Sequence, residues 1–154
     1  MLKKFSISLI LFLFFVCLDQ YIKFLFVNGF ENRGECISFI LVYNYGVAFS
    51  MFAFLAENLK YIQIAIMLGG ILYLIFNKDI FTLYYIPASV ILAGGVSNIY
   101  DRFIHGGVVD YIYWHCGFEF AVFNLADIII NTGVGLILLI SYLDAKKKKK
   151  LQTK

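Results

Sequence analysis

Four long apolar segments constrain this chain more than any other feature. A bilayer core of roughly 30 Å requires about 20 apolar residues in each crossing helix. Hydrophobic residues make up 62% of the 154 residues and charged residues only 15%, and a small soluble domain cannot bury that much apolar surface. The sequence therefore predicts an all-α polytopic membrane protein, with residues 1–154 as one membrane domain and a Lys-rich tail over 144–154. The segments run from about Phe5 to Val27, Tyr61 to Phe76, Leu83 to Tyr100 and Leu125 to Leu143.

The first segment has a rival interpretation as a cleavable signal peptide, because Lys3 and Lys4 precede it. The apolar run is too long for that role, since it continues through Asp19 and Lys23. It also contains no small-x-small cleavage site. We therefore interpret this segment as a transmembrane helix.

Positive charge is concentrated on one side of the four segments. By the positive-inside rule, that side is cytoplasmic, so both termini are expected inside. The run of Lys residues near the end is interpreted as a juxtamembrane segment that contacts anionic lipid rather than nucleic acid. The opposite side has four Lys and Arg residues, Lys23, Arg33, Lys60 and Arg102, together with eight of the ten carboxylates. The cytoplasmic side has nine of the 13, namely Lys3, Lys4, Lys78, Lys146 to Lys150 and Lys154.

Two connections are expected on the outer side. In the first, about Asn28 to Lys60, residues 37–43 are β-branched and aromatic enough to predict a strand, and residues 44–46 predict a turn. The apolar stretch over 47–55 predicts a short helix or strand on the membrane surface. The second connection, about Phe103 to Phe123, has aromatic side chains that suit headgroup anchoring. Cys36 and Cys116 lie one in each connection, and the sequence leaves their pairing open.

The third segment contains two further signals. Pro87, the only proline, predicts a kink in this helix, because its ring cannot follow an unbroken helical path. Gly94 and Gly95 predict a close contact with a neighbouring helix, since small residues allow helix backbones to approach.

Six ionisable residues lie within or beside the segments, where charge is costly, so each is a candidate functional group. Asp19 and Lys23 are four residues apart, which suits an intrahelical ion pair and a structural role. Arg102 suits the C-terminal end of a helix, and Asp101 is expected to cap or pair. The six residues are Asp19, Lys23, Asp101, Arg102, Asp110 and Asp127.

Asp110 and Asp127 form the most informative pair. Asp127 follows the N-cap candidate Asn124 by three residues and so suits the first turn of a helix. Asp110 is flanked by apolar residues and has no basic partner nearby in the sequence, so desolvation should raise its pKa. Two aspartates in a poorly solvated site tend to share one proton. One can then activate water while the other protonates a scissile carbonyl, so the pair is a candidate catalytic dyad.

Other catalytic chemistries find little support. The sequence has no His and Cys cluster with metal-ligand spacing, no Ser in a nucleophile elbow and no phosphate-binding loop. Two non-peptidase alternatives stay open. Intramembrane carboxylates also move protons or ions in small transporters, and a non-catalytic scaffold would use them only for pairing.

Five motifs, in order along nearly the whole chain, resemble those of lipoprotein signal peptidase, the signal peptidase II family of bacterial membrane aspartyl peptidases. One residue departs from the family pattern, because Ser97 replaces an expected glycine and should loosen a close helix contact. The motifs are Asp19-Gln-Tyr-Ile-Lys23, Asn44-Tyr-Gly-Val-Ala-Phe49, Gly94-Gly-Val-Ser-Asn98-Ile-Tyr-Asp-Arg102, Gly107-Val-Val-Asp110-Tyr and Phe123-Asn-Leu-Ala-Asp127.

The resemblance implies an aspartic endopeptidase in the bacterial cytoplasmic membrane. Asp110 and Asp127 would be its catalytic dyad at the outer face, under an extracytoplasmic β-cradle and a short surface helix. The substrate would be a prolipoprotein whose Cys already carries diacylglycerol, cleaved just before that Cys. No metal or organic cofactor, no nucleic acid and no second subunit are expected. The residues that would line the site and support substrate are Asn44, Asn98, Arg102 and Asn124.

Overall fold

The computed structural model describes residues 1–46, 51 and 53–152. Within them lie four helices that are long and apolar enough to cross a membrane, which confirms the predicted architecture. Each helix is longer than its predicted apolar run. The first two begin earlier, the third extends at both ends, and the fourth ends later. The helices are α1 (Leu2–Val27), α2 (Ala56–Phe76), α3 (Lys78–Ile104) and α4 (Leu125–Gln152).

Helix α3 is the centre of the bundle, because α1, α2 and α4 all pack against it. Val90 and Ala93 of α3 meet Ile129 of α4 in the buried core. A Cβ atom added at Gly94 would lie 2.6 Å from the carbonyl oxygen of Ala126. The absence of a side chain at Gly94 thus allows the close helix contact that the sequence predicts.

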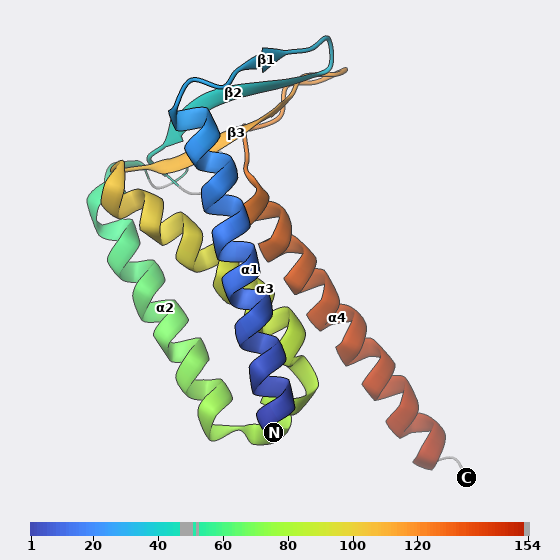
Figure 1. Cartoon of the computed structure of the whole chain (residues 1–154). Coiled ribbons are helices and arrows are strands. Elements are labelled where there is room, and N and C mark those ends of the chain that lie inside the picture. Colours follow the sequence, from blue (N-terminus) through green and yellow to red (C-terminus); the bar gives the residue numbers. More distant parts are fainter. Residues whose placement is uncertain (47–50, 52, 153–154) are drawn as a thin grey trace.

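Helix α3 is kinked as Pro87 predicts. Tyr84, three residues earlier, has non-helical angles (φ −114°, ψ 15°). Proline lacks a backbone N–H and its ring clashes with the carbonyl of residue i−4, which breaks the helix just before it. A single residue, Asn77, joins α2 to α3, so these two helices form a tight antiparallel pair (Figure 1).

A three-stranded antiparallel sheet covers one end of the bundle, opposite both termini (Figure 1). Its strands are β1 (Asn32–Arg33), β2 (Ile37–Asn44) and β3 (Val108–Trp114). Strand β2 confirms the strand predicted over 37–43. Strand β3 was not predicted individually, although its β-branched and aromatic residues give the same signal. Val42 pairs with Asp110 and Asn44 pairs with Val108, so the expected small β-cradle is present.

A disulfide joins Cys36 and Cys116, which answers the question that the sequence leaves open. It links the start of β2 to the residues after β3, where the backbone N–H of His115 also donates to the carbonyl of Cys36 (2.9 Å). The predicted surface segment over 47–55 lies mostly outside the described residues. Its described end, Ala53–Leu55, is a single 3-10 turn that leads into α2.

Candidate active site

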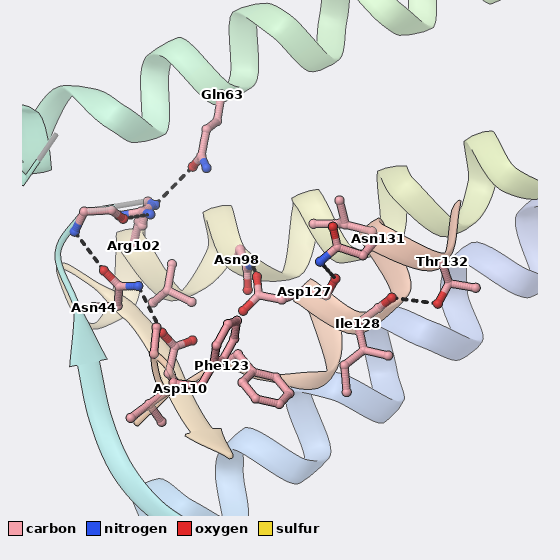
Figure 2. Close-up of a pocket in the computed structure, with 16 residues that line it drawn as sticks. Asn44, Gln63, Asn98, Arg102, Asp110, Phe123, Asp127, Ile128, Asn131 and Thr132 are labelled. Carbon is pink, nitrogen blue, oxygen red and sulfur yellow. Dashed lines mark hydrogen bonds between the residues drawn. The ribbon is translucent and has the colours of Figure 1, made fainter. Parts of the chain in front are cut away.

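Strand β3 and the N-terminus of α4 bring Asp110 and Asp127 to the same cavity, at the junction of sheet and bundle (Figure 2). The cavity has a volume of about 630 Å³. Its walls are mostly apolar, and its polar side chains converge from five elements, β2, α2, α3, β3 and α4. All six residues predicted for the site line this cavity or bond to those that do: Asn44, Asn98, Arg102, Asp110, Asn124 and Asp127.

Asn124 links the two carboxylates. Its side-chain Nδ2 donates to Oδ1 of Asp110 at 2.7 Å. Its backbone N–H donates to Oδ2 of Asp127 at 3.2 Å, and its Oδ1 accepts the backbone N–H of Asp127 at 2.9 Å. The last two contacts are a reciprocal capping box at the start of α4, as the spacing of Asn124 and Asp127 predicts. The same cap therefore fixes the helix and the position of both acids.

Asp110 is almost fully buried, with 2% of its surface exposed. Its second oxygen, Oδ2, accepts a hydrogen bond from Nδ2 of Asn44 on β2 (3.1 Å). Burial, and then the nearby charge of Asp127, raise the pKa of Asp110 to about 7, while the hydrogen bonds from Asn44 and Asn124 oppose that rise. The pKa increase expected from its apolar neighbourhood is confirmed, so this acid can carry a proton near neutral pH.

Asn98 reaches Asp127 from α3. Its Nδ2 donates to Oδ1 of Asp127 at 3.0 Å (Figure 2). Its Oδ1 accepts hydrogen bonds from Nδ2 of Asn124 (3.2 Å) and from Nζ of Lys23 (2.8 Å). Three asparagine amides thus surround the carboxylate pair, and each uses its donor end toward an acid.

Arg102, at the C-terminal end of α3, is buried on another side of the cavity. Its Nε donates to Oε1 of Gln63 on α2 (3.0 Å), and its Nη2 donates to the carbonyl of Gly46 (2.5 Å). Its Nη1 has no hydrogen-bond partner within the part of the chain that the structure describes. That nitrogen is a buried donor that the described residues leave without an acceptor.

Asp19 and Lys23 make the predicted ion pair on α1, at 2.7 Å, but the pair belongs to a larger buried cluster. Lys23 also contacts Asp101 (2.7 Å), and Asp19 accepts the backbone N–H of Ala126 on α4 (2.9 Å). Ser97 does not loosen the packing as expected. Its hydroxyl is fully buried and donates to Asp19 (2.5 Å).

Some residues at the cavity were missed by sequence reasoning. Gln63 lines the cavity and is a polar residue inside the second apolar segment, and this polarity could have identified it as a candidate site residue. Asn131 and Thr132 lie about one turn further along α4 than Asp127 and donate to carbonyls of the same helix (Figure 2). Their polarity in an apolar segment is a similar signal.

Comparison with known proteins identifies this arrangement. A family model described as "Signal peptidase (SPase) II" matches residues 11–143. The chain belongs to the signal peptidase II family. It is therefore an aspartic peptidase of the membrane, with four candidate spans.

Several relatives of this signal peptidase II are named lipoprotein signal peptidase. The protein from Sulfurimonas denitrificans is 57% identical over 125 residues, which cover 81% of this chain and 80% of the relative. That from Wolinella succinogenes is 53% identical, covering 85% and 90% of the two chains. A Helicobacter pylori protein is 43% identical and covers 99% of both.

The fold has solved counterparts. A bacterial membrane enzyme determined at 2.3 Å resolution superposes with a TM-score of 0.80, at 24% identity, over 93% of this chain and 92% of the other. A second, determined at 1.9 Å, gives a TM-score of 0.72, over 87% and 91%. Four helices with a sheet at one end are therefore an architecture that membrane enzymes adopt.

Proposed function

We propose that this signal peptidase II removes signal peptides from diacylglyceryl-modified bacterial prolipoproteins, cleaving before the lipidated Cys with Asp110 and Asp127 as catalytic acids. The observation that carries the proposal is the contact of Asn124 with both carboxylates at one cavity. Two acids held together in a poorly solvated place share a proton, as acid and base catalysis of amide hydrolysis requires.

The reaction needs no group beyond the dyad and water. The ionised aspartate removes a proton from water as its oxygen attacks the scissile carbonyl carbon. The protonated aspartate gives its proton to the carbonyl oxygen, and a tetrahedral diol forms. When the C–N bond breaks, the proton taken from water moves to the leaving nitrogen, and the diol returns a proton to the other carboxylate. The products are the signal peptide, which ends in a new carboxyl group, and a lipidated Cys with a free amino group.

We assign the base role to Asp127 and the proton-donor role to Asp110. Asp127 receives the backbone N–H of Asn124 and the amide of Asn98 in the first turn of α4, where the helix dipole favours negative charge. Asp110 has a pKa raised to about 7 by burial and by the charge of Asp127. Because the two groups interact, apparent pKa values in activity measurements belong to the pair.

Four neighbouring side chains would support the substrate. The buried Nη1 donor of Arg102 suits a backbone carbonyl of the signal peptide. Asn44, Asn98 and Asn124 orient the acids through the contacts described above. The apolar walls of the cavity suit the acyl chains that the Cys carries.

We further propose that the enzyme acts as a monomer within one membrane domain of the bacterial cytoplasmic membrane. Both termini and the Lys-rich tail would lie in the cytoplasm, in contact with membrane lipids, and the cavity would open at the outer face. The lipidated Cys lies at that outer surface while the signal helix lies in the bilayer, so this arrangement brings the scissile bond to the dyad.

The test is cleavage of a diacylglyceryl-modified preprolipoprotein by purified protein in detergent. Asp110→Asn and Asp127→Asn should each remove nearly all activity while the protein still inserts and binds substrate. The unmodified precursor, which lacks diacylglycerol, is the substrate control and should not be cleaved. Near-normal cleavage by either Asn variant would rule out a two-aspartate mechanism.

A further inference from the structure

Lys23 is a buried cation with no direct contact to either catalytic acid among the described interactions, yet the side chain of Asn98 connects it to Asp127. Only 2% of its surface is exposed. Its Nζ donates to Asp19 and Asp101, both at 2.7 Å, and to Oδ1 of Asn98 at 2.8 Å. An ammonium has three N–H donors, and these three acceptors match them.

The third contact, together with the weaker bond from Nδ2 of Asn124 to the same oxygen (3.2 Å), fixes which way the amide of Asn98 faces. With Oδ1 toward Lys23, Nδ2 faces Asp127 and donates to it at 3.0 Å. A flipped amide would direct its NH2 group at the ammonium and its oxygen at the carboxylate. Both of those contacts would be repulsive, because donor would face donor and acceptor would face acceptor.

This orientation matters when Asp127 changes its protonation state. An ionised Asp127 attracts the NH2 group without help. A protonated Asp127 can donate its proton, and an unrestrained amide would turn its oxygen to accept that proton. Because Lys23 already bonds that oxygen in a buried, low-dielectric place, the amide stays a donor throughout the cycle.

We propose that Lys23 is a positioning residue for peptide hydrolysis, which keeps the Asn98 amide as a fixed donor to Asp127. The inference rests on the proposed roles of Asp110 and Asp127. The competing explanation is that Lys23 only neutralises Asp19 and Asp101 and so stabilises the bundle. That explanation needs the two carboxylate contacts but gives no function to the contact with Asn98.

A charge-matched variant separates the two explanations. Lys23→Met alone would leave two buried carboxylates facing each other, which is strongly destabilising. The double variant Lys23→Met/Asp101→Asn keeps the cluster at the same net charge of minus one, since one cation and one anion are removed together. Asp101→Asn alone, which retains Lys23 and its bond to Asn98, is the control for the loss of the Asp101 carboxylate. Thermal unfolding in detergent follows the folding of each variant.

The readout is a double-mutant cycle on kcat and KM with lipidated substrate. Removing Lys23 in the charge-matched variant should lower kcat about ten-fold relative to Asp101→Asn, with KM within about two-fold. In an Asn98→Ala background the same removal should change kcat by less than about two-fold, because the amide through which Lys23 acts is gone.

Equal loss of kcat in both backgrounds, or no loss in either, would overturn the proposal. A charge-matched variant that fails to fold would also count against it, because Lys23 would then be needed for the fold itself. Asp127→Asn is assayed in parallel. If that variant is active, the proposed dyad fails; if it is inactive and the cycle is additive, only the role of Lys23 fails.

Discussion

At the residue scale, amides rather than cations hold the two carboxylates. None of the ion pairs among the described residues includes Asp110 or Asp127. Their partners are Asn44, Asn98 and Asn124. A cation in direct contact would favour the ionised form of both acids. Neutral amides position the carboxylate oxygens without forcing both acids to ionise, so the dyad can keep the one proton that it must share.

The pH dependence of activity should report the proton on Asp110. Its pKa is raised to about 7, so it carries a proton below that pH and loses it as pH rises. If Asp110 is the donor, kcat/KM should decline on the basic side near neutrality. The bond from Asn44 favours the ionised form, so Asn44→Ala should raise the pKa further and move this decline to higher pH.

The matched control for that pH profile is Asn77→Ala. Asn77 lies in the turn between α2 and α3, and its side chain donates to the carbonyl of Tyr73 at the end of α2, far along the chain from both acids. Its replacement should leave the profile in place. A basic limb that stays fixed in Asn44→Ala, or moves to lower pH, would show that another group sets it.

Arg102→Lys should impair turnover more than stability. The guanidinium donates to Gln63 and to Gly46, and its buried Nη1 has no acceptor among the described residues. A lysine cannot reproduce three donors in one plane. We expect kcat/KM to fall by about ten-fold or more while the unfolding temperature changes little. If the Arg102→Lys variant were as active as the unchanged protein, Arg102 would act only as a positive charge at the end of α3.

At the element scale, the site depends on the contact between α3 and α4. Asn98 lies one turn beyond Gly94 on α3, and Asp127 follows Ala126 on α4. The closeness of Gly94 to Ala126 therefore sets the reach of the Asn98 amide to Asp127. Asp19 of α1 fixes the same place from a third helix, through the backbone N–H of Ala126.

Gly94→Ala should therefore lower both stability and activity. The new Cβ would lie 2.6 Å from the Ala126 carbonyl, which is backbone and cannot move away without shifting α4. Overpacking of this kind costs about 1–3 kcal/mol. Thermal unfolding and kcat measure the two effects.

Gly135→Ala is the matched control on α4, because nothing lies within 4 Å of its added Cβ. A helical Gly→Ala change without a clash is expected to stabilise by roughly 0.5–1 kcal/mol. Its kcat should be unchanged. If Gly94→Ala behaved in the same way, the close helix contact would not be what positions Asn98.

The sequence predicts the helices better than it predicts the sheet and the site contacts. Apolar length alone marks each helix, because only a continuous hydrogen-bonded element can cross a bilayer. Strand β3 is short and lies in an aromatic connection, where membrane anchoring explains the same residues equally well. Asp19 and Lys23 are predictable as a pair from their spacing. Their contacts with Asp101 and Asn98 are not, since these depend on how α1 packs against α3.

At the scale of the whole molecule, most of the positive charge lies at the opposite end from the two catalytic acids. Both termini and the turn at Lys78 lie at one end of the bundle, and the sheet lies at the other (Figure 1). Asp110 and Asp127 are at the sheet end, in the cavity between sheet and helices. The disulfide of Cys36 and Cys116 is also at the sheet end. Disulfides persist in oxidising compartments, which agrees with an extracytoplasmic sheet.

The last prediction is the orientation in the membrane. Four spans place both termini on the same side, and nine of the 13 Lys and Arg residues lie on that side. A reporter fused after Lys154 should therefore be active only in its cytoplasmic form. As a control, the same reporter inserted in the second outer connection at Gly117, a positive-φ glycine with open space around it, should be active only outside. Outside activity of the C-terminal fusion would put the dyad in the cytoplasm, where a lipidated Cys at the outer surface could not reach it.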